Sequence, residues 1–372
     1  MKVPAQVYDF SPNDIDWITS ELRRLLESKG FLTMGKYGEQ FEQEFARYHG
    51  ARYSVATNSG TAALEIILRT LNVAGGEVVV PTNTFAATAF AVIRAGALPI
   101  FADIQQDMTL DPADAEKRVR ANTRAIITVH IGGLVSPATR RLAELCRTRN
   151  IFLMEDAAHA HGSAHGGEMA GTLGIAGAFS FFSTKVMTTG EGGMILTSDE
   201  GVYRRAQLLR DQAKVGGANY HETLGYNWRM PEMQAIMGLA QLRRLDEFIA
   251  RRQYIAAIYD RELDGISQLT PLRPAACLRH NYYKYFVILN GPTPQRIKDE
   301  LKRRYDIALA GFTYELPLHQ QPAFRDYAQG SLPVAEDLCR RHICLPIYPS
   351  LTDAQARYVA QSLREVVSSY AD

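Results

Sequence analysis

The sequence predicts an α/β fold, in which a large domain built on a mainly parallel sheet precedes a smaller α+β domain. Short apolar runs alternate with amphipathic helical segments between residues 53 and 210. Alternation at this short spacing is typical of a parallel sheet whose two faces are covered by helices. A long helix-prone segment at 230–263 then precedes a second group of strands and helices, which indicates a further domain.

Composition and charge narrow the possible functions. The chain has 372 residues, 46% hydrophobic and 22% charged, as is ordinary for a soluble globular protein. Its formal net charge of +1 predicts no attraction to nucleic acid or to an anionic membrane. No secretory signal and no apolar stretch of membrane-spanning length are evident, so a cytoplasmic protein is expected. The scattered cysteines, Cys146, Cys277, Cys339 and Cys344, predict neither a zinc site nor a disulfide framework.

The first fifty residues are predicted to form an arm followed by two helices. Residues 1–15 contain two prolines and are expected to be extended. At 14–29, apolar residues recur with the spacing of a helix, and Gly30 ends the pattern. A second amphipathic helix is predicted at 38–48, and it ends at Gly50.

The alternating region comes next. Its strands are short and rich in apolar residues, and helical patterns lie between them. The strands are predicted at 53–57, 77–80, 98–102, 124–130, 151–154, 177–182 and 194–197. One helix is predicted to begin within the NSGTAAL motif at 58–64. Further helices are predicted at 85–94, 111–119, 138–149 and 199–210.

The C-terminal part is predicted to form the smaller domain. Segment 230–263 is expected to be one long helix, because its proline, Pro231, lies at the start, where proline is tolerated. A strand at 282–289 and helices at 294–305 and 353–366 follow. The expected organisation is an N-terminal arm at 1–15, a large domain at 16–250 and a small domain at 251–372.

The NSGTAAL motif at 58–64 places small polar residues and a glycine between a strand and a helix. Such a helix start offers backbone N–H groups, a favourable dipole and room for close approach, which together suit an anion. The alternative is an ordinary N-cap, in which Ser59 or Thr61 closes the helix and nothing is bound. The motif contains neither a Walker GK[ST] sequence nor a GxGxxG fingerprint, so an NTPase or a nicotinamide enzyme is not supported.

The segment IFLMEDAAHAHGS at 151–163 places Glu155 and Asp156 at the end of an apolar strand, with His159 and His161 behind them. Ligands bind at the carboxyl ends of parallel strands. An aspartate there could keep the pyridinium nitrogen of pyridoxal 5′-phosphate (PLP) protonated, so that the cofactor acts as an electron sink. A metal site and a solvated helix cap are the alternatives. Against the metal, the two histidines are two residues apart and no third ligand is evident.

The segment GAFSFFSTKVMTTGEGG at 177–193 carries a lysine soon after an apolar strand. Ser180 and Ser183 could reach phosphate oxygens, and Lys185 could form a Schiff base with PLP. Burial would lower the pKa of this lysine and make its free amine a base. A solvated surface lysine is the alternative. An anion site, a strand-end aspartate and a lysine, in that order along the chain, make a coherent PLP site.

Linked motifs run through nearly the whole chain. They are TMGKYGEQFEQEFARYHGARYSVATNSGTAAL, VVVPTNTFAATAFAVIRAGALPIFADI, EDAAHAHGS, FSFFSTKVMTTGEGG, GYNWRMPEMQAIMGLAQL, PLHQQPAF and LPIYPSLT. In this order they resemble the sugar aminotransferase family called DegT/DnrJ/EryC1/StrS, which belongs to the aspartate-aminotransferase-like PLP enzymes of fold type I. The resemblance implies a large domain with a mainly parallel seven-stranded sheet. It also implies PLP as the cofactor, with pyridoxamine 5′-phosphate as its intermediate form.

The resemblance also implies roles for single residues. Lys185 is expected to form the Schiff base, Asp156 to pair with the pyridine nitrogen, and His159 to lie near the phenolic oxygen. Phe85, in the TNTF motif, is expected to stack on the cofactor ring. The residues expected to hold the phosphate are Gly60, Thr61 and Ser180.

Two further positions are implied at the edge of the site. Asn227, in the GYNWRM motif, is expected to reach the phosphate of the neighbouring subunit's cofactor, so that a homodimer builds shared active sites. By itself this motif is typical of a packing turn. His319, in PLHQQPAF, resembles a position near the substrate, and a surface or structural histidine is the alternative.

For function, the resemblance implies transfer of the amino group of L-glutamate to a nucleotide-linked keto-deoxysugar. Histidine at 159, in EDAAHA, resembles the C4 enzymes of the family and favours a dTDP-4-keto-6-deoxyhexose as the acceptor. A C3 sugar or cyclitol aminotransferase is the alternative, followed by a sugar dehydratase or a regulatory relative. The dehydratases carry histidine in place of Lys185. The chain departs from the family directly after Lys185, where it has VMTTGEGG and the family more often has NLGALGEGG. This departure leaves the role of the lysine intact but weakens the assignment of the substrate.

Overall fold

The computed structural model describes residues 1–216, 219–275, 278–310 and 313–370. Its centre is a seven-stranded sheet in the order β1-β9-β8-β5-β4-β2-β3. Strand β9 runs antiparallel to both its neighbours and the other pairs are parallel, which confirms the predicted mainly parallel sheet. The strands are β1 (Tyr53–Thr57), β2 (Glu77–Pro81), β3 (Leu98–Ala102), β4 (Thr123–Val129), β5 (Phe152–Asp156), β8 (Ala176–Ser180) and β9 (Gly193–Thr197).

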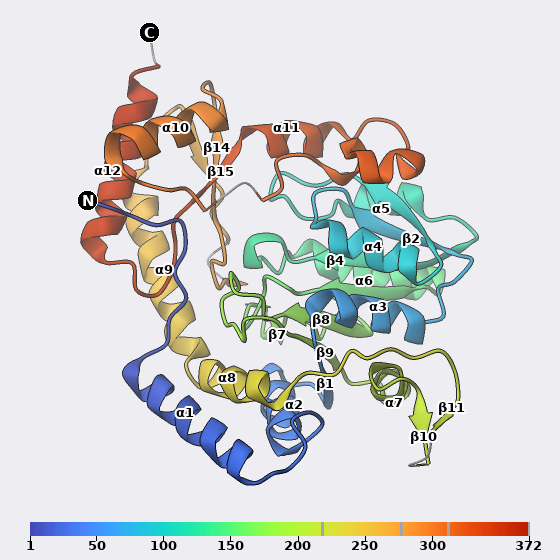
Figure 1. The fold of residues 1–372 in the computed structure, drawn as a ribbon. Helices are drawn as coiled ribbons and strands as arrows, with labels where there is room; N and C mark the ends of the chain where they lie inside the picture. The colour runs from blue at the N-terminus through green and yellow to red at the C-terminus, as the bar shows by residue number, and fades with distance from the viewer. Residues whose placement is uncertain (217–218, 276–277, 311–312, 371–372) are drawn as a thin grey trace.

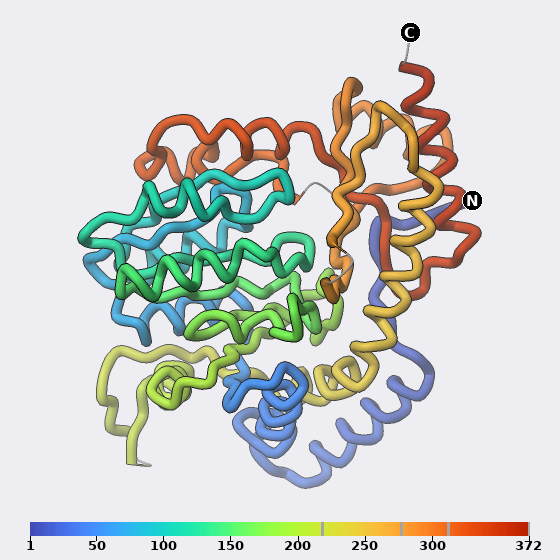
Figure 2. Tube along the Cα trace, turned by 180° about the vertical axis from the view of Figure 1, so that it is seen from behind, coloured from blue at the N-terminus to red at the C-terminus, as the bar shows by residue number. Residues whose placement is uncertain are grey.

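Helices cover both faces of this sheet, as Figure 1 and Figure 2 show. One face carries α3 (Gly60–Thr70), α4 (Ala86–Arg94) and α7 (Glu200–Arg210), and the other carries α5 (Pro112–Arg118) and α6 (Ala138–Arg149). On β2, Val78 and Val80 pack in the core on the α3 side, whereas Val79 packs on the α6 side. Successive residues of a strand alternate between faces, so a strand buried on both sides is apolar throughout.

The chain begins with an arm that contacts distant parts of the protein. Val3 forms a β-bridge with Ile307, and the Gln6 side-chain amide donates a hydrogen bond to the carbonyl of Thr184. Two helices follow, α1 (Pro12–Glu27) and α2 (Lys36–His49). They pack against helix α8 (Glu232–Arg243), which lies beside them in Figure 1. The arm thereby joins the beginning of the chain to the C-terminal part.

The prediction of one uninterrupted helix at 230–263 is wrong. The structure has two helices, α8 and α9 (Leu245–Glu262), separated by a bend at Arg244. The backbone there has φ −105° and ψ 4°, and the guanidinium group is ion-paired with Asp9 at 2.8 Å and with Asp14 at 2.7 Å. These two partners come from the N-terminal segment, so contacts with distant residues help to stabilise the bend, together with the nearby Glu247 at 2.7 Å. Local helix propensity does not reveal such partners.

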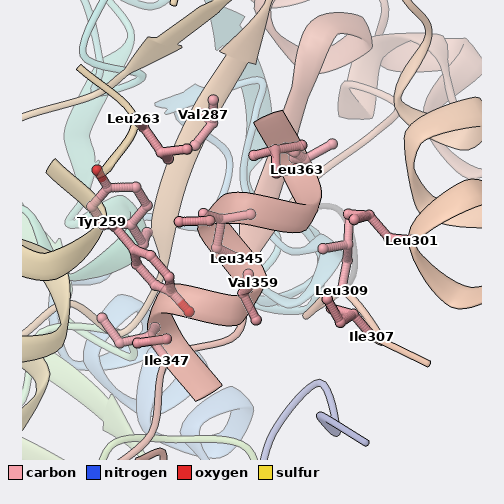
Figure 3. Packing of buried hydrophobic residues seen from close by; sticks show 14 of the residues in the cluster. Tyr259, Leu263, Val287, Leu301, Ile307, Leu309, Leu345, Ile347, Val359 and Leu363 are labelled. Carbon is pink, nitrogen blue, oxygen red and sulfur yellow. The ribbon is translucent and has the colours of Figure 1, made fainter. Parts of the chain in front are cut away.

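After α9 the chain forms a three-stranded antiparallel sheet in the order β12-β14-β15. The elements here are β12 (Leu269–Pro271), β14 (Tyr285–Leu289), α10 (Pro294–Tyr305), α11 (Pro333–Arg341), β15 (His342–Leu345) and α12 (Asp353–Ser368). Figure 3 shows Tyr259 of α9, Leu345 of β15 and Leu363 of α12 in one buried cluster. This cluster is separate from the cores beside the large sheet, as a smaller domain requires. The predicted boundary between residues 250 and 251 falls within α9 and stays a prediction.

The strand predicted at 282–289 begins later, at Tyr285. Tyr282 has φ 47°, in the left-handed region that interrupts an extended strand. The residues directly before β14 therefore form a turn rather than a strand. This turn carries Tyr283 and Lys284 towards the large sheet.

Several short elements were not predicted, because segments of two to six residues show little periodic pattern. They are the strands β6 (Ala164–His165), β7 (Glu168–Met169), β10 (Lys214–Val215), β11 (Tyr220–His221) and β13 (Leu278–Arg279), and the 3-10 helices η1 (Ile131–Gly133), η2 (Leu318–Gln320) and η3 (Pro322–Tyr327). Within the described ranges, no helix has the length and apolar character needed to cross a membrane. Cys146, Cys339 and Cys344 are buried free thiols, and Cys277 lies outside the described residues.

Candidate active site

A cavity of about 510 Å³ lies at the carboxyl ends of the central strands. Val129, Asp156 and Ser180, the last residues of β4, β5 and β8, all line it. This edge of an open α/β sheet is where ligands bind. The predicted site residues that line the cavity are Gly60, Thr61, Phe85, Asp156, His159, Ser180 and Lys185.

The start of helix α3 forms part of the cavity wall. Ser59 caps the helix by accepting a hydrogen bond of 3.1 Å from the N–H of Ala62, so Gly60 and Thr61 hold the earliest N–H groups of the helix. A Cβ atom on Gly60 would lie 2.7 Å from the Cβ of Ser180. Glycine therefore allows the helix to begin this close to the end of β8. First-turn N–H groups and the helix dipole at such a point favour an anion.

Asp156 is buried beside the cavity, with 5% of its surface exposed. Its Oδ2 accepts a hydrogen bond of 2.7 Å from Thr88 Oγ1, and its Oδ1 accepts one of 3.2 Å from the N–H of Ala158. Burial raises the pKa of this carboxyl group, whereas the two hydrogen bonds and the charge of Lys185 act in the opposite direction. A cation bound in the cavity would favour the ionised carboxylate.

Glu155, the neighbouring carboxylate, does not line the cavity. Its Oε2 lies 2.8 Å from His130 Nε2 and 2.7 Å from the N–H of Gly171. Its Oε1 accepts hydrogen bonds from the N–H groups of Leu173 and Gly174, each of 2.7 Å. These bonds satisfy the buried carboxylate and hold the following loop against β5. Across the described ranges, no group of three or more histidine, cysteine, aspartate or glutamate side chains is arranged to hold a metal ion.

Lys185 reaches the cavity from the turn after β8, where its N–H donates a hydrogen bond of 2.9 Å to the carbonyl of Phe182. Its side chain is half-buried, and loss of hydration lowers the pKa of its amine to about 8, although the charge of Asp156 acts in the opposite direction. Its Nζ lies 5.1 Å from the ring centroid of Tyr283. An amine with this pKa is partly neutral near physiological pH, so it can act as a nucleophile or a base.

His159 stacks on Tyr283, with ring centroids 4.3 Å apart and an angle of 29° between the planes. The N–H of Gly132 donates to its Nδ1 at 3.3 Å, which leaves the proton of the neutral ring on Nε2. Nε2 lies 3.5 Å from the hydroxyl of Tyr314. Burial, assisted by the charges of nearby lysines, lowers the pKa of His159 well below its usual value. The ring is therefore neutral and offers one N–H donor.

Phe85 and Asn227 are both exposed. Phe85 lines the cavity, whereas Asn227 does not. Phe85 precedes α4 with 60% of its surface exposed, and its ring centroid lies 6.1 Å from that of Tyr314. Asn227 lies outside the cavity of its own chain, where its carbonyl accepts a hydrogen bond of 3.4 Å from Asn58 Nδ2. Its contact with a neighbouring subunit stays a prediction.

His319, in η2, is buried outside the cavity lining. Its Nδ1 lies 2.7 Å from Thr82 Oγ1, and its Nε2 lies 3.0 Å from Glu336 Oε1. Both ring nitrogens therefore have partners within the protein. This placement favours the structural alternative for His319, and a contact with substrate stays a prediction.

The comparisons with known proteins agree with one another. GDP-perosamine synthase of Escherichia coli O157:H7 is 34% identical over 346 residues, which cover 92% of this chain and 93% of that protein. The dTDP-3-amino-3,4,6-trideoxy-alpha-D-glucose transaminase of Micromonospora megalomicea subsp. nigra is 35% identical over 350 residues, 92% of each chain. The solved PLP-form of the putative sugar aminotransferase Spr1654 from Streptococcus pneumoniae is 27% identical, with a TM-score of 0.92 over 100% of both chains.

A sequence model of the DegT/DnrJ/EryC1/StrS aminotransferase family matches residues 13–364. The chain belongs to this family. Membership confirms the predicted fold and enzyme class, and it makes the protein a PLP-dependent aminotransferase.

The cavity of this DegT/DnrJ/EryC1/StrS enzyme has a feature to match each reactive part of PLP. The start of α3, with Gly60 pressed against Ser180, suits a phosphate group. The buried carboxylate of Asp156 suits a protonated pyridine nitrogen, and the amine of Lys185, with its lowered pKa, suits an aldehyde. The residues present therefore fit the cofactor of the family.

The cavity residues that sequence reasoning did not single out include Gln6, Tyr283, Lys284 and Tyr314. Tyr283 and Lys284 lie in a segment with the pattern of a strand, and Gln6 lies in the arm. Local pattern does not distinguish them, because tertiary contacts bring them to the cavity. Thr88 does not line the cavity but holds Asp156, and it follows Thr84 by four residues in TNTFAAT.

Proposed function

We propose that this aminotransferase moves the amino group of L-glutamate to a nucleotide-linked keto-deoxysugar. The observation that supports this function is that Lys185 and Asp156 face one cavity together with the start of α3. The names of the E. coli and Micromonospora relatives refer to GDP-linked and dTDP-linked amino sugars. Each of these relatives aligns with more than nine-tenths of this chain, so the comparison spans the whole proposed site.

In this proposal, Lys185 binds PLP covalently and Asp156 pairs with the pyridine nitrogen. A pyridinium group would supply the opposite charge that a buried carboxylate needs. The phosphate would be held by the first-turn N–H groups of Gly60 and Thr61 and by the hydroxyl of Ser180. These three residues meet where α3 approaches the end of β8.

Two rings complete the proposed cofactor site. Phe85, exposed at the start of α4 and facing the cavity, would stack on the cofactor ring. His159 is neutral and would donate its Nε2–H to the phenolic oxygen. Its stacking on Tyr283 fixes the plane of the imidazole, so the donor has one direction.

PLP, when bound, takes up the negative charge that develops at the substrate carbon after proton loss. Lys185, once the donor has displaced it, would remove the proton from the α-carbon of L-glutamate. In the second half of the cycle the same amine would return a proton to the aminated sugar carbon. Its pKa of about 8 leaves a useful fraction of neutral amine near neutral pH.

For the acceptor we propose a dTDP-linked 4-keto-6-deoxyhexose, aminated at C4. The support is histidine at 159, a cavity residue that resembles the C4 enzymes of the family. Amination at C3 is the second candidate, because the Micromonospora relative, which is 35% identical, is named for a 3-amino sugar. A cyclitol acceptor is a further alternative. Lys185 and Asp156 at one cavity favour transamination over a dehydratase or a regulatory protein without catalysis.

We also propose that the active unit is a homodimer in which Asn227 reaches the phosphate of the neighbouring subunit's cofactor. Asn227 is exposed and lies outside the cavity of its own chain. Its side chain is therefore available to another subunit, whereas a contact with its own cavity is not seen.

Borohydride reduction tests the covalent assignment. The PLP-loaded protein is reduced and digested, and the peptides are analysed by mass spectrometry. The cofactor mass is expected on the peptide that contains Lys185, and Lys185→Ala should carry no label. The exposed Lys117 provides a control, since Lys117→Met should be labelled as the wild type is. A label on any other lysine would contradict the assignment.

An acceptor panel tests the substrate. Nucleotide-linked 3-keto and 4-keto sugars, carrying dTDP, GDP or UDP, are supplied with L-glutamate, and the aminated carbon is located by NMR. Amination at C4 of the dTDP-linked sugar is expected, with one 2-oxoglutarate formed per amino sugar. Amination at C3 would support the second candidate, and a dehydrated product without 2-oxoglutarate would contradict transamination.

A further inference from the structure

Lys284 is a buried cation in the wall of the cavity. It directly precedes β14, exposes 7% of its surface and lines the cavity. Its Nζ donates a hydrogen bond of 3.0 Å to the carbonyl of Ala310 and lies 5.0 Å from the ring centroid of Tyr283. In the part of the chain that the structure describes, Lys284 forms no ion pair with a carboxylate.

A buried ammonium group without a counter-ion is costly, because burial removes hydration that no opposite charge replaces. Nζ has three N–H donors, and the Ala310 carbonyl uses one of them. The face of the Tyr283 ring provides a weaker attraction for the charge. An anionic group bound in the cavity would supply both the missing charge and further acceptors.

The turn that carries Lys284 is held in one place. The N–H of Lys284 donates a hydrogen bond of 3.1 Å to the carbonyl of Gly132, and Asn281 Nδ2 donates one of 2.9 Å to the carbonyl of His159. Gly133 has φ 100°, and a Cβ atom there would lie 1.9 Å from Asn281 Oδ1. The close approach therefore depends on glycine. A charge fixed in this way is arranged before any ligand arrives, as a binding group has to be.

The position of Lys284 relative to Lys185 indicates which anion it binds. Their Nζ atoms lie 5.0 Å and 5.1 Å from the same ring centroid, that of Tyr283. In an amino acid, the α-carboxylate is attached to the carbon that bears the reacting amino group. In a nucleotide-linked sugar, the sugar ring separates the keto carbon from the phosphates. We infer that Lys284 binds the α-carboxylate of the amino donor, an inference that rests on the proposed function.

Two ligands and two variants test this inference by calorimetric titration of the PLP-loaded protein. α-Methyl-L-glutamate keeps both carboxylates but has no α-proton to lose, and 4-aminobutyrate is glutamate without its α-carboxylate. Lys284→Gln keeps a donor for the Ala310 carbonyl but removes the charge, and Lys284→Arg keeps the charge. For Lys284→Gln, the Kd of α-methyl-L-glutamate should rise roughly ten- to a hundredfold, as loss of a hydrogen bond to a charged group predicts.

The controls set the limits of the test. In Lys284→Gln, the Kd of 4-aminobutyrate should change by less than about twofold, because the lost partner is absent from this ligand. Lys284→Arg should bind α-methyl-L-glutamate within about fivefold of the wild type. If Lys284→Gln does not fold, Lys284→Met replaces it, with a retained thermal unfolding temperature as the criterion.

If Lys284→Gln raised the Kd of both ligands equally, or of neither, the assignment of Lys284 to the donor would be overturned. An unchanged donor Kd with a raised KM for the keto-sugar would place the anion on the acceptor and would overturn it as well. Failure of the proposed function has a different signature. The wild-type protein would then bind α-methyl-L-glutamate but transfer no amino group to a sugar, and the comparison of variants would still decide the role of Lys284.

Discussion

Thr88 Oγ1 donates a hydrogen bond of 2.7 Å to Oδ2 of Asp156, across 68 residues of sequence. Thr88 belongs to α4 and Asp156 to the end of β5, so this bond joins a helix to the strand end at the cavity. Thr88 Oγ1 is itself 2.8 Å from Oγ1 of Thr84, which lies just before the helix. The orientation of the carboxylate is thereby tied to the helix that follows Phe85.

Replacing Thr88 by valine keeps the shape of the side chain and removes this donor. The pKa of Asp156 should rise further, because a hydrogen bond to the ionised form is lost. We expect the Kd for PLP to increase roughly tenfold. Absorbance titration of the cofactor-free protein with PLP measures this Kd. Thr88→Ser keeps the hydroxyl and should bind as the wild type does, and equal affinities in all three proteins would contradict the prediction.

The amine of Lys185 should react with PLP over a pH range centred near 8 in the cofactor-free protein. Burial lowers its pKa to about 8, and the neutral amine is the nucleophile, so the rate should rise between about pH 7 and pH 9 and then level off. In Asp156→Asn the midpoint should move to lower pH, because the carboxylate charge raises the pKa of Lys185 in the wild type. Stopped-flow absorbance gives both profiles. A midpoint that moves to higher pH in the variant would be incompatible with this coupling.

Gly60→Ala should separate the start of α3 from the end of β8. The added Cβ atom would lie 2.7 Å from the Cβ of Ser180, so helix or strand has to shift. We expect a loss of roughly 1–3 kcal/mol in the free energy of unfolding, together with weaker PLP binding. Gly30→Ala is the matched control, since its Cβ would meet only the Ser28 side chain at 3.3 Å, and its stability should change by less than about 0.5 kcal/mol. Urea unfolding of both variants decides the matter.

A mixed dimer tests whether Asn227 acts across the subunit interface. A hybrid of one Lys185→Ala protomer and one Asn227→Ala protomer would contain one intact site and one site with both defects. Random mixing of the two variants should therefore restore about a quarter of the wild-type sites, although each variant alone is impaired. Activity of the mixture against each parent is the measurement. If Asn227 acts within its own chain, no intact site forms and the mixture stays at the level of its parents.

Much of the large sheet was predictable, because its signals are local. The strand at 98–102 and the helix at 138–149 have the predicted bounds in the structure. Both are continuous patterns bounded by residues that stop them. The bend at Arg244 was missed because two of the partners that stabilise it, Asp9 and Asp14, lie far away in the sequence.

In the candidate site, too, the residues within local motifs were predictable and a residue placed by distant contacts was not. Asp156 and Lys185 follow apolar strands within recognisable motifs, and the structure places both at one cavity. Glu155 shows the limit of such motifs, because it is adjacent to Asp156 and chemically similar but serves the packing of a loop. Lys284 was missed because its segment has the pattern of a buried strand, and its function depends on a turn that positive φ at Tyr282 creates.

The extended arm has a practical consequence for work with this enzyme. Within nine residues it contacts the strand-like segment at Ile307, the carbonyl beside Lys185 and, through Asp9, the bend at Arg244. Trimming these residues to obtain a shorter protein would remove contacts with three distant parts of the chain at once, one of them beside Lys185. Expression vectors that leave the first ten residues unaltered are the safer choice for kinetic work.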